Sequence, residues 1–118
     1  MGQIKSAPQG HLFLAIMSAS EHQRQVALEE VRTRFGEIMG AGPLFSVSDF
    51  TNYYESEFGR DLKKQLFIFK QPTSLESAHQ IKVWTNQIES QFVDNTGSQS
   101  HRQVNLDPGY LEPSKLVL

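Results

Sequence analysis

The sequence predicts an α+β fold of the ferredoxin-like type, with element order β-α-β-β-α-β and both helices on one face of an antiparallel sheet. Two observations carry this prediction. Four short runs rich in apolar residues have the length of strands, and two longer segments have apolar residues at helical spacing. One helical segment lies between the first two strands and the other between the last two, and right-handed crossovers then place both helices on the same face.

The first half of the chain supplies one strand, one helix and a weaker second strand. Residues 11–17 form an unbroken apolar run, and Ser18 or Ser20 can begin a capping box for the helix that follows. Gly36 stands where a helix commonly ends, and Gly40 with Gly42-Pro43 predicts a loop. Residues 44–48 are the candidate second strand. This half therefore reads strand, helix, strand.

The second half repeats that order. Residues 64–70 predict a strand with charged ends, and Thr73 with Glu76 has capping-box spacing for a second helix. The apolar stripe of this helix consists of Ala78, Ile81, Trp84 or Thr85, Ile88 and Phe92. Residues 102–106 form the fourth strand. We expect Asp107-Pro108-Gly109 to end it in a tight turn, with positive φ at Gly109.

Composition excludes several classes of function. The 118 residues contain no cysteine, which removes disulfides, thiolate metal sites and a cysteine nucleophile. The net charge of −2 offers no broad basic field, so we expect neither nucleic acid nor a membrane as a partner. No secretory signal pattern opens the chain, and a cytoplasmic location is the expectation. The sequence also lacks the P-loop pattern of nucleotide-binding proteins.

Apolar residues occupy both faces of two predicted strands. Alternate residues of a strand point to opposite faces, yet residues 12–17 and 66–69 are apolar throughout. Because helices cover only one face, we expect a second copy of the chain or a C-terminal segment to cover the other. The candidates for that second face are Phe13, Met17, Phe67 and Phe69. The sequence therefore predicts a homo-oligomer formed through the second sheet face.

Three strings carry a resemblance along nearly the whole chain: DFTNYYESEFG at 49–59, NLDPGYL at 105–111 and the closing KLVL. With the opening MGQIK, they resemble an uncharacterised prokaryotic family, domain of unknown function 4416. The resemblance implies no activity. Because family members continue past the equivalent of KLVL, it implies a C-terminally shortened form of a single domain: residues 1–10 as a polar lead, 11–111 as the core and 112–118 as the start of a further segment.

The candidate functional residues come from the first two of these strings. A ligand site is expected from Asp49, Thr51, Tyr53, Tyr54, Glu55, Asn105, Asp107 and Tyr110. If the two segments converge, the carboxylates of Asp49, Glu55 and Asp107 suit a divalent cation such as Mg²⁺ or Ca²⁺. A simpler interpretation gives these residues structural roles, with Asp49 as a cap and the tyrosines packed at a rim.

Two hypotheses for function follow, and the sequence leaves open whether the protein is an enzyme. The first is a non-enzymatic module that binds a ligand or assembles with itself, because no complete catalytic motif is present. The alternative is a metal-dependent or acid–base hydrolase that uses carboxylates of the DFTNYYE and NLDPGY segments.

Overall fold

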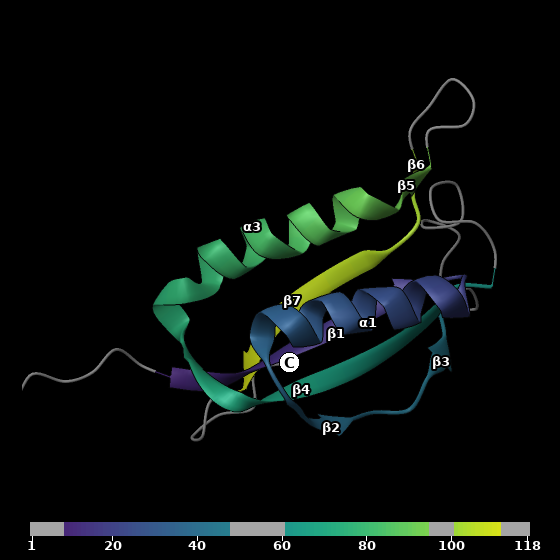
Figure 1. The fold of residues 1–118 in the computed structure, drawn as a ribbon. Coiled ribbons are helices and arrows are strands. Elements are labelled where there is room, and N and C mark those ends of the chain that lie inside the picture. Colours follow the sequence, from purple (N-terminus) through teal and green to yellow (C-terminus); the bar gives the residue numbers. More distant parts are fainter. Residues whose placement is uncertain (1–8, 48–60, 95–100, 112–118) are drawn as a thin grey trace, which may run out of the picture.

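The computed structural model describes residues 9–47, 61–94 and 101–111. The elements follow one another in chain order (Figure 1): β1 (Gln9–Ser18), α1 (Glu21–Phe35), β2 (Ile38–Ala41), β3 (Phe45–Ser46), β4 (Lys63–Ser74), a 3₁₀ turn (Leu75–Ser77), α3 (Ala78–Glu89), a second 3₁₀ turn (Ser90–Phe92), β5 (Val93–Asp94), β6 (His101–Arg102) and β7 (Asn105–Leu111). These elements form an α+β domain.

The main sheet of the described residues has five strands, and every pairing in it is antiparallel. The strands run in the order β2-β4-β1-β7, and β3 pairs with β4 beside β2. The first strand therefore lies at the centre, between β4 and β7. The short strands β5 and β6 pair with each other in a separate two-stranded sheet.

Both helices pack on the same face of the main sheet, as Figure 1 shows. From β1 the core takes Leu12, Leu14 and Ile16, each at most 1% exposed. From the other elements it takes Ala27, Val31, Phe67, Phe69, Ile81, Ile88, Val104 and Leu106. Burying these side chains is the main source of stability of the fold. Within the described ranges, neither helix combines the length and the apolar character that crossing a membrane requires.

The ends of α1 confirm two predicted signals. The Oγ of Ser20 accepts a hydrogen bond from the Gln23 N–H at 3.1 Å, so Ser20 is the N-cap residue. Gly36 ends the helix with φ of 96°, a value that favours glycine, and its N–H donates to the Arg32 carbonyl. Phe35 then packs its ring against Phe69, with centroids 5.8 Å apart.

The start of the second helix was predicted wrongly. Thr73 does not cap it, because β4 continues to Ser74 and Thr73 pairs with Gly10 of β1. The Glu76 N–H donates to the Ser74 Oγ, and α3 begins after the 3₁₀ turn with Ser77 as its N-cap. Strand pairing with β1 therefore prevents Thr73 from acting as the helix cap that the capping-box pattern predicted. The buried part of the predicted stripe on α3 is Ile81, Thr85 and Ile88.

The second predicted strand is split in two. Gly40, predicted to lie in a loop, belongs to β2, and the break falls at Gly42-Pro43 before β3. Pairing continues across the break, because the Gly42 N–H donates to the Leu66 carbonyl of β4 at 2.8 Å. β4 therefore provides one long template for both short strands.

Asp107-Pro108-Gly109 does not form the predicted turn. These residues lie inside β7, where Asp107 pairs with Ala15, Pro108 with Leu14 and Gly109 with Phe13. Gly109 has no positive φ; among the described glycines only Gly36 does. Pro108 is tolerated because β7 is a terminal strand of the described sheet, where a missing N–H can face away from the neighbour.

Candidate functional site

The face of the sheet opposite α1 and α3, called the far face below, combines apolar and charged side chains. The register of β1 against its two neighbours assigns the residues to it: Phe13, Ala15 and Met17 from β1, Lys64, Leu66 and Ile68 from β4, and Asn105, Asp107 and Gly109 from β7. Phe67 and Phe69, predicted as candidates for this face, lie in the core under the helices instead. Phe13 and Met17 lie on the far face.

One end of the far face is closed by a small second core. Met17 is 1% exposed and packs with Val47 and Leu62, which come from either side of residues 48–60. The Val47 N–H donates to the Leu62 carbonyl at 2.9 Å and holds these two segments together. Met17 is therefore structural, and it does not line the groove described next.

The middle of the far face is hollowed into a groove of about 420 Å³. Its lining residues, the far-face groove below, are Phe13, Ala15, Phe45, Lys64, Leu66, Asp107 and Pro108. Phe45 and Leu66 are each 40% exposed, which is high for large apolar side chains on a sheet. The groove therefore contains accessible apolar area.

The two charged residues of the groove come from opposite sides of β1. Lys64 lies on β4 and Asp107 on β7, so the strand of Ala15 runs between them. Within the part of the chain that the structure describes, neither residue forms an ion pair; the two pairs found there join Arg32 to Glu29 and Lys70 to Glu37. The groove thus has an apolar floor with one positive and one negative side.

Gly109 gives Phe13 its position in the groove. A Cβ atom at Gly109 would collide with Cζ, Cε1 and Cε2 of Phe13, so the ring crosses directly over the glycine. Glycine is the residue that permits such a close approach to the backbone. The role of Gly109 is therefore to make room for the Phe13 ring.

The structure places three of the eight predicted site residues. Asn105 and Asp107 lie on the far face, whereas Tyr110 has the opposite parity and packs against the core under the helices. The Tyr110 hydroxyl is buried without a hydrogen-bond partner in the described residues, and burial raises its pKa above the usual 10.0. Of the three, only Asp107 lines the far-face groove.

The other five predicted residues, Asp49, Thr51, Tyr53, Tyr54 and Glu55, lie outside the described residues. The proposed cation site of Asp49, Glu55 and Asp107 is thus represented by Asp107 alone. The described ranges contain no cluster of three or more His, Asp or Glu side chains suited to a metal ion. The cation site and the hydrolase hypothesis stay predictions.

Phe45, Lys64 and Leu66 line the groove but were not among the predicted site residues. The unbroken apolar run of residues 66–69 indicated that the strand has two apolar faces. The alternation alone did not show whether Leu66 and Ile68, or Phe67 and Phe69, lie on the face away from the helices. Phe45 joins the groove through pairing with Lys64 across two strands distant in sequence. No local pattern signals such a contact.

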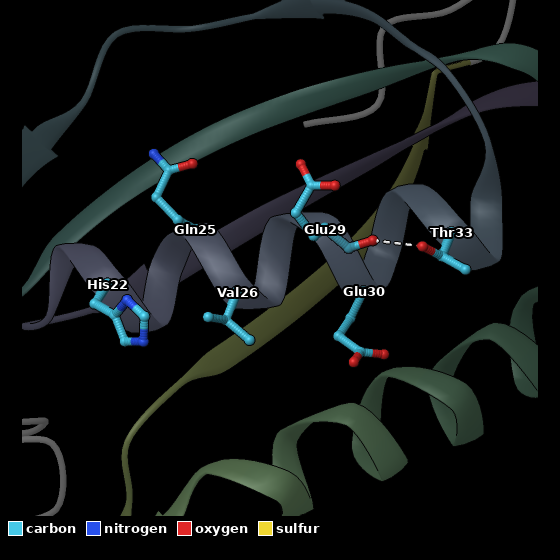
Figure 2. Close-up of a pocket in the computed structure, with 6 residues that line it drawn as sticks. All are labelled: His22, Gln25, Val26, Glu29, Glu30 and Thr33. Atoms are coloured by element: carbon cyan, nitrogen blue, oxygen red, sulfur yellow. Dashed lines mark hydrogen bonds between the residues drawn. The ribbon is translucent and has the colours of Figure 1, made fainter.

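A second hollow, of about 400 Å³, lies along α1 and is lined by that helix alone (Figure 2). Its residues are His22, Gln25, Val26, Glu29, Glu30 and Thr33. Figure 2 shows Gln25 and Glu29 pointing to one side of the helix and Val26 and Glu30 to the other. The Thr33 hydroxyl donates to the backbone carbonyl of Glu29 at 2.9 Å. These polar groups do not converge on a common point, so this hollow offers no built site.

Comparison with known proteins assigns a family without an activity. No curated protein and no solved structure matches the chain. The match to a family model covers residues 8–118, which include both helices and every strand of the main sheet. The chain belongs to the family described as domain of unknown function (DUF4416).

Proposed function

We propose that the protein is a non-enzymatic binding module built on a ferredoxin-like fold. Two observations support the ferredoxin-like assignment. Along the chain, β1 and α1 precede β2 and β3, and β4 and α3 precede β7; in the sheet, the strands run in the order β2-β4-β1-β7. Counting β2 and β3 as one interrupted strand gives β-α-β-β-α-β. Both helices lie on one face, and the opposite face is then available for binding.

The observation that carries the proposed function is the far-face groove. Phe45 and Leu66 leave apolar area accessible at its centre, and burying such area against a ligand is favourable at about 25 cal/mol per Å². Lys64 and Asp107 on opposite sides can orient what binds. The ligand class that fits is a molecule or protein surface with an apolar middle and charged groups at its edges.

A dye that fluoresces on apolar surfaces tests this proposal. Anilinonaphthalene sulfonate should bind the protein, and Leu66→Gln should reduce the fluorescence several-fold because it places an amide in the middle of the groove. Met39→Gln is the matched control: Met39 is 54% exposed on β2 and does not line the groove. Neither change alters the charge. Equal fluorescence of the two variants, with circular dichroism like that of the wild type, would contradict the proposal.

A further inference from the structure

We infer that the far-face groove binds the same groove of a second copy, in a two-fold dimer in which Lys64 of each protomer lies against Asp107 of the partner subunit. This inference rests on the proposed function and names its ligand as a second chain. It joins two observations: the groove is apolar and partly exposed, and its charges stand on opposite sides of one central strand.

The symmetry of the sheet favours this pairing. A two-fold axis that lies between two stacked sheets and runs along β1 places β4 of one protomer over β7 of the other. Such an interface is isologous, so each contact occurs twice. Lys64 is in register with Met17 and Asp107 with Ala15, an offset of roughly 7 Å along the strand. The long lysine side chain and the roughly 30° crossing of aligned sheets accommodate this offset.

The charge pattern of the groove makes it self-complementary. A single positive and a single negative residue on the two sides of β1 would meet their opposites when the face meets itself, giving two equivalent ion pairs. Among the described residues of one chain, Lys64 and Asp107 form no ion pair, so dimer formation would break none there. The apolar centre, with Phe13, Phe45 and Leu66, would be buried between the sheets.

The size of the groove predicts a reversible dimer. The far face spans the three neighbouring strands β4, β1 and β7 and is closed at the Met17 end, so we expect its contact area to fall toward the small end of specific interfaces. We therefore expect association that changes over the concentration range of a sedimentation experiment. Sedimentation velocity of the wild type should show the dimer fraction rising with concentration.

Charge reversal tests which residues meet. Lys64→Glu alone and Asp107→Lys alone should each raise the dissociation constant at least about tenfold, because each sets like charges against each other twice. Mixing the two variants in equal amounts should restore dimers, since in the mixed dimer both pairs are again opposite in sign. An ion pair within one chain would not be restored by mixing. Lys82→Glu and Glu30→Lys, on exposed helix positions, are the matched controls.

The outcomes separate this inference from the proposed function. A wild type that is monomeric at all concentrations but binds the dye through Leu66 would overturn the dimer and leave the binding module in place. A monomer whose groove does not bind the dye would overturn both. Dimers that ignore the charge reversals, or single variants that mixing does not rescue, would overturn the Lys64–Asp107 pairing.

Discussion

The two faces of the main sheet use the same strands in different ways. Along β1, Leu12, Leu14 and Ile16 on the helix-covered face are at most 1% exposed. On the far face, Phe13 is half-buried, and Leu66 of β4, the register partner of Ala15, is 40% exposed. The difference indicates that packing under the helices stabilises the fold, while the far face keeps apolar area that a single described chain does not bury.

The largest expected effect compares one leucine from each face. Leu14→Ala should cost about 2–5 kcal/mol, because Leu14 is fully buried and leaves a cavity under the helices. Leu66→Ala should cost less than about 1 kcal/mol, since its side chain already contacts water. Urea denaturation at low protein concentration measures both. Equal losses would mean that the far face contributes as much to folding as the helix-covered face.

A smaller effect is expected where Gly109 meets Phe13. Gly109→Ala should destabilise the protein by about 1 kcal/mol, because the added methyl group forces the Phe13 ring to move. In a Phe13→Leu background the same substitution should cost less, and a double-mutant cycle measures the coupling. Additive effects would show that the ring and the glycine do not interact.

The sequence predicted the order of the main elements because the signals for them are local. The apolar run of residues 11–17, the Ser20 cap and the Gly36 end each depend on a few neighbouring residues. The wrong predictions occur where strand pairing between residues distant in the sequence determines the local structure. Thr73 is held in a strand by Gly10, and Asp107 to Tyr110 are held in a strand by Leu12 to Ala15. Turn and cap propensities were weaker than these ladders.

The candidate site was predicted only in part for the same reason. Asp107 was identified from the NLDPGYL string and does line the groove. Tyr110, three residues later, has the opposite parity and packs against the core. It was predicted as a site residue because the string was interpreted as a turn rather than as a strand. Phe45 and Lys64 come together only through the pairing of β3 with β4. The strand register was therefore needed to determine which side chains lie on which face of the sheet.

The smallest expected effect concerns Tyr110, the residue that the strand register turns away from the groove. Its hydroxyl is buried without a partner in the described residues, so Tyr110→Phe should leave stability unchanged or raise it by up to about 1 kcal/mol. A clear loss of stability would indicate a hydrogen bond to the hydroxyl.

The titration of Tyr110 gives a second measurement of the same environment. Burial raises its pKa in the folded state above the ordinary 10.0, so the unfolded chain releases this proton first as the pH rises. The free energy of unfolding should therefore decrease above about pH 10, with its full value retained at lower pH. The informative quantity is the difference in this pH dependence between the wild type and Tyr110→Phe. Urea denaturation of both at about pH 8 and about pH 11 should show the wild type losing more stability than the variant. Parallel losses would place the hydroxyl in water and move Tyr110 out of the helix-covered core.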